Sequence, residues 1–180
     1  QVFEARAGRP DSRPLGPTAA SLASVSSTGE LALILGCRLD WANCVGTLAR
    51  MPPGGGAPPR ELLEHVVSAD WTPDGQALAA IQAVGGEYQL QFPIGKPLYT
   101  TSGRLNCVRF SPRGERLAFV ESPLLSEETR VLKAVDLQGQ VTTVTTGLSL
   151  IRELAWSPGG DEIWLTGTEH GRTSSIYVVS

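Results

Sequence analysis

One short sequence unit recurs along this chain, and it constrains the fold more than any other feature. In Val67–Ile81 the unit reads VSADWTPDGQALAAI, which indicates a short strand ending on Trp71, a tight TPDG turn and a second, more apolar strand. The unit returns at Leu105–Val120 and Ile151–Thr166, and in a weaker form at Leu22–Leu35. Four copies of one hairpin predict a repeat protein.

The turn of each unit explains why the hairpin recurs. In three copies a proline presets φ at the first central position of the turn, and in all four a glycine at its end permits a positive φ. These turn glycines are Gly29, Gly75, Gly114 and Gly160, which are 46, 39 and 46 residues apart. Repeats of about 40–45 residues with four strands each are typical of β-propeller blades. We therefore predict an all-β fold: a β-propeller, or an open propeller arc, of about four four-stranded antiparallel blades.

Apolar residues predict how the blades pack. The second strand of each unit has almost no polar break, as in Ala77–Ile81 and Ile163–Leu165, so both of its faces should be buried. Just before each turn stands a large apolar residue that should pack one blade on the next; these residues are Val25, Trp71, Phe110 and Trp156. We expect the three aromatic side chains to be almost fully buried between blades.

The strand pattern predicts a single domain over residues 1–180. Residues 1–20 would supply the outer strands of a partial blade, residues 21–66, 67–104 and 105–149 one blade each, and residues 150–180 a second partial blade. This division contains 17 strands. Within it, Arg60–Val67 is the only stretch that could instead form a short helix, and Met51–Pro59 is a loop on one rim.

The two ends of the chain are complementary in this division. A ring closed within one chain would have to combine both partial blades, and it would leave one strand over. The alternative is an open arc, whose terminal blades expose apolar flanks and so favour self-association. We expect the arc, with homodimerisation through the complementary terminal blades.

Composition narrows the choice of partners. The net charge of −3 comes with no basic stripe, which argues against nucleic acid. No run approaches the roughly 18 apolar residues that cross a membrane, so we expect no membrane contact within this chain. There is no signal peptide, and the chain begins with glutamine rather than methionine. We therefore expect a processed or cloned piece of a longer protein.

Motifs that would carry chemistry are missing from the sequence. Gly-x-Ser-x-Gly, the nucleophile turn of many hydrolases, does not occur. His65 and His170 have no partners at metal-ligand spacing; we expect His65 to be a partly exposed strand or turn residue and His170 to lie in a loop. The Gly54–Gly56 run lacks the lysine and helix of a phosphate-binding loop. We predict a non-enzymatic protein with no catalytic, metal or cofactor site.

The three cysteines bear on the cellular compartment. Cys37 and Cys44, with six residues between them, lie in the loop after an inner hairpin, and the ends of such a loop can approach to disulfide distance. The sequence leaves open whether they are bridged or free. A bridge would indicate an extracytoplasmic compartment. Cys107 lies on an innermost strand and should be a buried, inert thiol.

The innermost strands of a propeller line its central channel. The candidate channel-lining residues are Asp70, Arg109 and Glu153. Asp70 and Arg109 fall at one level in adjacent blades, so they could pair across the channel wall. Such a pair would be either a structural ion pair that closes the channel or part of a polar site for a small ligand or ion.

The loops that follow the second strands should emerge on one face, near residues 36–43, 83–87, 121–129 and 167–173. Binding residues gather on loops held by a rigid scaffold. The candidate binding residues on this face are Arg38, Asp40, Trp41, Asn43, Glu127, Glu128, His170 and Arg172. Trp41 would be either a recognition anchor or a lid packed on its own loop. The charged residues would be either binding groups or ordinary solvated surface.

The repeated unit resembles a known family. A Trp or Phe, a Ser or Thr, a Pro, one variable residue and a Gly, followed by an apolar strand, resemble the WD40-like (PD40) repeats of TolB-type propellers. Thr47–Gly75 further resembles the TolB-like extracytoplasmic domains of bacterial membrane-bound serine/threonine kinases. The kinase's own HRD, DFG and Gly-rich signatures are absent.

This resemblance implies an extracytoplasmic binding or sensing portion of a larger bacterial protein. Its ligand would be a protein, a peptide or a small molecule, which the sequence does not identify. The alternative function is an accessory propeller that gates the catalytic domain of a peptidase or other hydrolase, with that domain outside this chain.

Overall fold

The computed structural model describes the chain except residues 1, 6, 9–10, 41–42, 124–128 and 170–172. The described residues form fifteen β-strands and one short 3-10 turn at Pro53–Gly55. The strands are β1 (Val2–Ala5), β2 (Ser12–Leu15), β3 (Ala20–Val25), β4 (Leu31–Asp40), β5 (Asn43–Met51), β6 (Arg60–Trp71), β7 (Leu78–Val84), β8 (Glu87–Gln91), β9 (Pro97–Thr101), β10 (Arg104–Phe110), β11 (Arg116–Ser122), β12 (Arg130–Asp136), β13 (Val141–Trp156), β14 (Ile163–Glu169) and β15 (Ser175–Val179).

The strands form three antiparallel sheets: β1–β2, β3 to β9 in sequence order, and β10 to β15 in sequence order. The two large sheets each hold two propeller blades joined by one long strand. The first half of β6 pairs with β5 and its second half with β7, and β13 links β12 to β14 in the same way. Two pairs of expected strands are therefore continuous, which gives fifteen strands among the described residues instead of 17. The helix considered for Arg60–Val67 was wrong, because this segment is part of β6.

We number the blades along the chain. Blade 1 contains β3, β4, β5 and the first half of β6, and blade 2 contains the second half of β6 with β7, β8 and β9. Blade 3 contains β10, β11, β12 and the first half of β13, and blade 4 contains the second half of β13 with β14 and β15. The long strands bend where one blade passes into the next: φ is 58° at His65 in β6 and 89° at Gly147 in β13.

The four turns that carry the sequence signature share one hydrogen-bond pattern. Each turn glycine has a φ between 71° and 85°, and its amide donates at 2.8–2.9 Å to the carbonyl three residues earlier. The Ser or Thr of the signature accepts a hydrogen bond from an amide beyond the turn, as Ser111 does from Arg116 and Ser157 from Glu162, both at 3.1 Å. In blade 2, Asp74 also accepts from the Gln76 amide at 3.0 Å. Local hydrogen bonds thus explain each residue type in the signature.

The apolar core lies between neighbouring blades, in a separate cluster at each interface. Forward-facing residues of one second strand meet backward-facing residues of the next, for example Ala79 and Ile81 of β7 against Leu117 and Phe119 of β11. Equivalent clusters lie between blades 1 and 2 and between blades 3 and 4. The second strands of blades 1 to 3 are buried on both faces, as their continuous apolar sequences predict.

The residue before each turn packs against the preceding blade. Trp71 is 4% exposed and Phe110 is 7% exposed, which agrees with the expected burial. The Arg50 guanidinium of blade 1 stacks on the Trp71 ring at 4.8 Å and forms a two-point ion pair with Glu30. Val25, the first residue of this series, is 51% exposed because no complete blade precedes it.

Two expectations of burial at blade 4 were wrong. Trp156 is only half-buried, beside a cavity between blades 3 and 4. The apolar segment Ile163–Leu165 is buried on one face alone, since Trp164 is 49% exposed. Trp164 is exposed because no blade in the described chain follows blade 4, so the forward face has nothing to pack against. Trp156 instead faces blade 3, where the Arg116 guanidinium lies 5.8 Å from its ring centroid, and the cavity beside the ring leaves it half-exposed.

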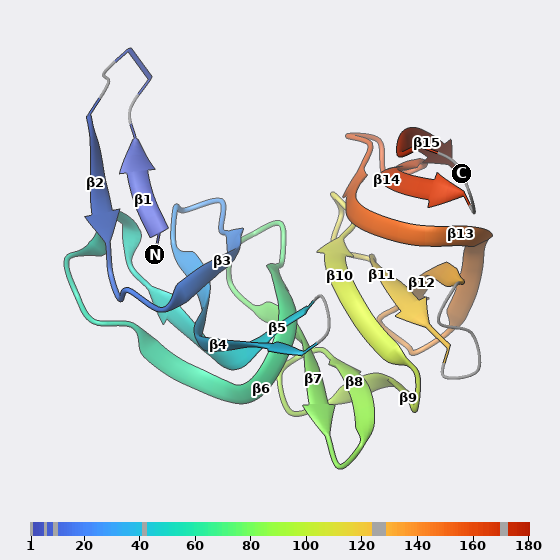
Figure 1. Cartoon of the computed structure of the whole chain (residues 1–180), viewed down its shortest axis with the longest axis horizontal. Coiled ribbons are helices and arrows are strands. Elements are labelled where there is room, and N and C mark those ends of the chain that lie inside the picture. The colour runs from blue at the N-terminus through green and yellow to red at the C-terminus, as the bar shows by residue number, and fades with distance from the viewer. Residues whose placement is uncertain (1, 6, 9–10, 41–42, 124–128, 170–172) are drawn as a thin grey trace.

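The molecule is an open arc rather than a closed ring. Figure 1 shows the β1–β2 sheet at one end of the arc and β14–β15 at the other, with the two ends apart. Leu15 of β2 packs on Leu31, Leu33 and Met51 of blade 1, so the N-terminal sheet covers the outer part of the face that precedes blade 1. No helix in the described part of the chain is long and apolar enough to span a bilayer.

Candidate ligand-binding cleft

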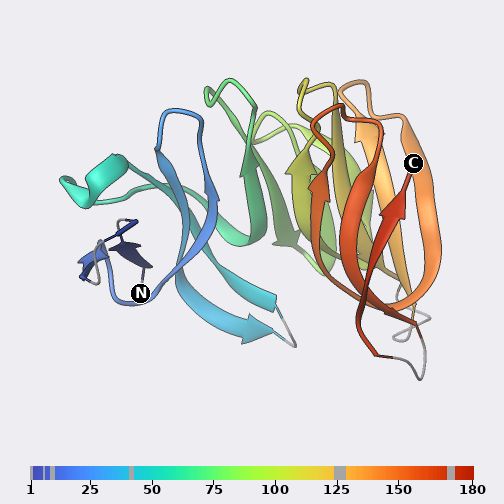
Figure 2. The ribbon, with the colours of Figure 1, turned by 90° about the horizontal axis from the view of Figure 1, so that it is seen from above.

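A cavity of about 440 Å³ opens where blade 1 meets blade 2. It lies between the β4–β5 hairpin, the bend of β6 and the end of β7. The lining residues are Leu35, Gly36, Arg38, Val45, Gly46, Thr47, Glu64, His65 and Ala83. Figure 2 shows that the β4–β5 hairpin points to the edge opposite the signature turns. The cleft is therefore built from second-strand and interblade connections, on the side where the sequence predicts binding residues.

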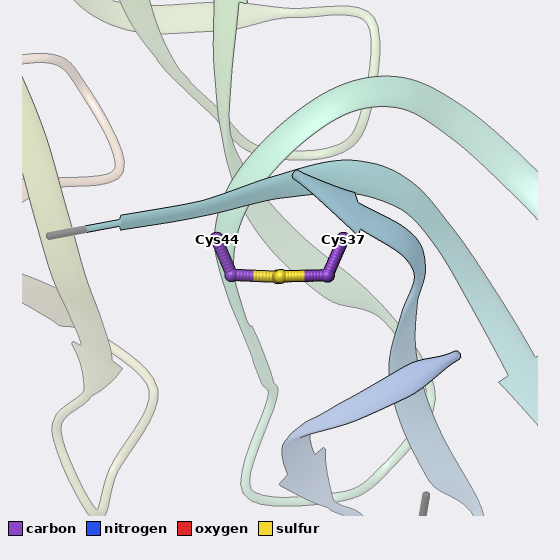
Figure 3. Close-up of a disulfide and its surroundings, with 2 residues drawn as sticks. All are labelled: Cys37 and Cys44. Carbon is purple, nitrogen blue, oxygen red and sulfur yellow. A yellow bond between two sulfur atoms is a disulfide. The ribbon is translucent and has the colours of Figure 1, made fainter. Parts of the chain in front are cut away.

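The β4–β5 hairpin is longer than the sequence predicts. A loop was expected near residues 36–43, but the ladder continues to the pair Asp40 and Asn43. Cys37 and Cys44 form a disulfide that joins the two arms of the hairpin, with their Cα atoms 5.2 Å apart (Figure 3). At Gly46 a Cβ atom would lie 2.2 Å from the carbonyl oxygen of Leu35, so only glycine allows this approach. The bridge and the glycine hold the wall of the cleft in place.

The opposite wall is set by an unusual backbone conformation. His65 has a φ of 58°, a left-handed conformation that costs a side-chain-bearing residue about 1 kcal/mol or more. The equivalent bend of β13 is made by Gly147. The bend is fixed from blade 2, because the Gln82 side-chain amide donates to the Glu64 carbonyl at 2.9 Å and is itself held by Gln91 at 2.8 Å. Strain of this kind is concentrated at functional sites.

The cleft combines charged and apolar groups. Arg38, Glu64 and His65 are exposed at its mouth, and Leu35, Val45 and Ala83 supply partly buried apolar surface. A guanidinium and an imidazole offer donors to an anion. The cleft is therefore chemically suited to a ligand that carries an anionic group next to an apolar one.

The structure describes some of the predicted binding-face residues and not others. Arg38 lines the cleft, and the backbones of Asp40 and Asn43 form the last pair of the β4–β5 ladder. The remaining candidates, Trp41, Glu127, Glu128, His170 and Arg172, lie outside the described residues. His65 was expected only as a partly exposed strand or turn residue, and it is exposed at the bend. The sequence signal that could have marked His65 is its position: β6 has a histidine at the bend where β13 has Gly147.

The ion pair suggested for Asp70 and Arg109 needs correction. Asp70 and Arg109 form no ion pair among the described residues. Instead, one Asp70 carboxylate oxygen accepts from the Ser24 hydroxyl at 2.6 Å, and the other accepts from the Phe110 amide at 2.8 Å. Asp70 thus links the inner strands of blades 1, 2 and 3. The Arg109 guanidinium donates to the Val108 carbonyl of its own strand at 2.8 Å. Both members of the expected pair therefore have other partners, because Asp70 accepts from Ser24 and Phe110.

Cys107 and Glu153 lie close together on neighbouring inner strands. Cys107 is half-buried rather than fully buried, and its thiol donates to the Arg152 carbonyl at 3.2 Å. Burial, with the negative charge of Glu153 adding to it, raises the pKa of the Cys107 thiol to about 11. The thiol is therefore protonated at neutral pH, which is the inert state that the sequence predicts. Glu153 itself is exposed.

Glu121 is a polar feature that the sequence does not reveal. It was expected at the start of a rim loop, but it lies in β11 and is buried. Its carboxylate accepts from Thr101 at 2.6 Å and Tyr99 at 3.1 Å and pairs with Lys133. Burial alone would raise the pKa of Glu121, but these hydrogen bonds and the Lys133 charge hold it below its ordinary value. The network joins the outer part of blade 2 to blade 3 and is structural.

Metal-binding groups do not gather anywhere in the described ranges: no three His, Cys, Asp or Glu side chains there could share an ion. No protein-family model matches the sequence, and no curated protein matches it. Solved structures do match its fold. TolB from Acinetobacter baumannii superposes with a TM-score of 0.67 and 21% identity, over 89% of this chain and 40% of that one.

Two further structures agree with this match. A putative TolB from Agrobacterium tumefaciens gives a TM-score of 0.65 at 18% identity, over 89% of this chain and 56% of that one. The chain has a TolB-like β-propeller fold. The propeller domain of the Trilobed protease from Pyrococcus furiosus, described as having an open velcro topology, gives 0.59 at 12% identity, over 89% of this chain and 53% of that one. The chain thus spans between 40% and 56% of these TolB-like and propeller structures.

Proposed function

We propose that this TolB-like arc is a non-enzymatic binding portion of a larger extracytoplasmic protein, and that its ligand binds in the cleft between blades 1 and 2. The ligand class is a peptide or small molecule with a carboxylate next to an apolar group. The carboxylate would meet Arg38 and His65, and the apolar group would rest on Leu35 and Val45. Glu64 would accept a hydrogen bond from a donor on the same ligand.

The observation that carries this proposal is the strained His65 at the cleft. A glycine would make the same bend without strain, as Gly147 does in β13. A side chain kept there at a cost in stability, beside an exposed arginine and an apolar wall, is best explained by a binding role.

Two features support the extracytoplasmic part of the proposal. The Cys37–Cys44 bridge is of the kind that persists in oxidising compartments. The resemblance of Thr47–Gly75 to the extracytoplasmic propellers of membrane-bound kinases favours a sensing role outside the cytoplasm. The alternative, an accessory propeller of a peptidase, is favoured by the likeness to the Trilobed protease propeller, and it would place the catalytic groups outside this chain.

NMR spectroscopy tests the binding site directly. The probes are short peptides that end in an apolar residue with a free carboxylate, and the same peptides amidated at the C-terminus. We expect the free-acid peptides to shift the His65 and Gly46 resonances. Arg38→Glu should weaken this binding by at least about tenfold, since a charged hydrogen bond becomes a repulsion. The amidated peptides should bind the unaltered chain as weakly as the free-acid peptides bind the Arg38→Glu variant.

One control variant and one variant of His65 complete the test. Arg60→Glu makes the same charge change on an exposed residue of β6 outside the cleft, and it should leave binding unchanged. His65→Gly should weaken binding while keeping or raising thermal stability, because it removes the left-handed strain. Equal losses from Arg38→Glu and Arg60→Glu, or no shift at the cleft with any peptide, would refute the proposed site.

A further inference from the structure

A second cavity, of about 250 Å³, lies between blades 3 and 4. Its lining includes Trp156, Arg116 next to the signature turn of blade 3, and Asp161 in the signature turn of blade 4. The cavity therefore lies at the edge of the signature turns, whereas the β4–β5 hairpin points to the opposite edge (Figure 2). It is separate from the cleft between blades 1 and 2.

The internal repeat explains why this cavity exists. One position of the third strand lies in front of the aromatic residue that ends the inner strand of the next blade. Arg50 in blade 1 and Ala134 in blade 3 hold this position, because they pair with equivalent alanines of the second strand. Phe92, which follows the last paired residue of β8, holds it in blade 2.

The side chain at this position covers the neighbouring aromatic ring in two of the three interfaces. The Arg50 guanidinium lies 4.8 Å from the centre of the Trp71 ring, and the Phe92 ring meets Phe110 edge to face at 5.0 Å. In blade 3 the alanine at this position reaches no further than its methyl group, and the space beside Trp156 stays open. The cavity thus results from one small residue inside the repeat.

Trp156 presents a ring of fixed orientation to this space. Its indole N–H donates to the Arg109 carbonyl at 3.1 Å, so the polar atom of the ring already has a partner. Val144 and Ile163 add apolar surface to the lining. An aromatic face with aliphatic neighbours packs well against the C–H groups of a saturated ring.

Charged groups of both signs surround the ring. The Arg116 guanidinium lies 5.8 Å from the ring centroid and forms no ion pair in the part of the chain that the structure describes. The Asp136 carboxylate is oriented by two backbone amides of its own turn, at 2.8 and 2.9 Å. The Ser157 hydroxyl donates to Asp161 at 2.8 Å and lowers the pKa of that carboxyl, which is therefore ionised at neutral pH.

We propose that this cavity binds one ring of a neutral sugar. Each sugar hydroxyl both donates and accepts, so neighbouring hydroxyls can accept from Arg116 and donate to Asp136 and Asp161 at the same time. The C–H face of the sugar would lie on Trp156. An ionic ligand of either sign would meet a like charge in the lining. The volume is below the roughly 300–1,000 Å³ of pockets for drug-sized ligands, which favours a single ring.

NMR spectroscopy of the whole chain tests this site, with glucose, galactose and N-acetylglucosamine as probes. We expect at least one of these sugars to shift the indole N–H resonance of Trp156 saturably and to leave that of Trp71 in place. Methylguanidinium serves as a charged probe of similar size. A shift of Trp156 with methylguanidinium and with none of the sugars, or with no probe at all, would overturn the proposal.

Two variants test the named residues. Ala134→Arg gives blade 3 the side chain that blade 1 has at this position; it should fill the cavity and weaken sugar binding by at least about tenfold, with thermal stability kept by stacking on Trp156. Arg116→Met keeps the length of an exposed side chain but removes its donors, and it should also weaken binding by about tenfold. If Ala134→Arg does not fold, Arg116→Met decides.

Two control variants complete the test. Arg152→Met makes the same change on an exposed residue outside the cavity and should leave sugar binding unchanged. Arg38→Glu, which alters the cleft between blades 1 and 2, should leave it unchanged as well, because the two sites are separate. Sugar binding that the folded variants of the cavity do not weaken, or that Arg152→Met weakens equally, would show that the sugar binds elsewhere.

Discussion

Replacing Asp70 with alanine should destabilise three blades at once. Its carboxylate accepts from the Ser24 hydroxyl of blade 1 at 2.6 Å and from the Phe110 amide of blade 3 at 2.8 Å. Hydrogen bonds to a charged group contribute about 1.5–3 kcal/mol each. Asp70 keeps partial contact with water, so the lower values apply, and Asp70→Ala should reduce the free energy of unfolding by about 3 kcal/mol. This is a large part of the roughly 5–15 kcal/mol typical of a domain.

Urea unfolding followed by tryptophan fluorescence and circular dichroism measures this loss. Ser24→Ala removes one of the two hydrogen bonds and should cost about 1.5 kcal/mol. Arg109→Gln tests the ion pair that the sequence suggested; because Arg109 bonds its own strand instead, its loss should cost about 0.5 kcal/mol or less. The reasoning fails if Asp70→Ala costs no more than Ser24→Ala, or if Arg109→Gln costs as much as Asp70→Ala.

Three further outcomes are expected. Trp71→Ala should cost roughly 3–5 kcal/mol in urea unfolding, and Trp156→Ala clearly less because its side chain is only half-buried; equal costs would contradict the described packing. Thiol titration of the denatured, non-reduced chain should find one reactive thiol, that of Cys107, and three would contradict the bridge. The Glu121 pKa is lowered on folding from 4.5, so its contribution to stability is present above that pH and is lost as pH falls through the lowered value. The pH dependence of thermal stability on the acid side should therefore be flatter in Glu121→Gln than in the native chain, and identical slopes would argue against the network.

Local chemistry in the sequence predicts much of the fold. The proline, the hydroxyl and the glycine of each signature turn act within a few residues of one another, so the hairpins at Gly75 and Gly114 follow from the sequence alone. The two-sided apolar strands likewise predict blades packed on both faces. That prediction holds for Ala79 and Ile81, which have a blade on each side.

The cleft was accessible to sequence analysis only in part. Arg38 was placed on the correct hairpin, but Glu64 and His65 come from the far end of the next interblade strand. They reach the cleft because β6 bends in a left-handed conformation at His65, which no periodicity predicts for a histidine. The bridge between Cys37 and Cys44 depended on a hairpin longer than the turn signals suggest.

The sequence by itself determined the repeat, the turn geometry and the strands that are apolar on both sides, because these depend on residues that are neighbours along the chain. The tertiary structure alone decided which groups meet across blades: Asp70 binds Ser24 and Phe110, which are 46 and 40 residues away. It also decided that Val25 and Trp164 stay exposed although they are as apolar as their buried counterparts. Burial depends on whether a neighbouring blade is present, and an arc has two ends where it is not.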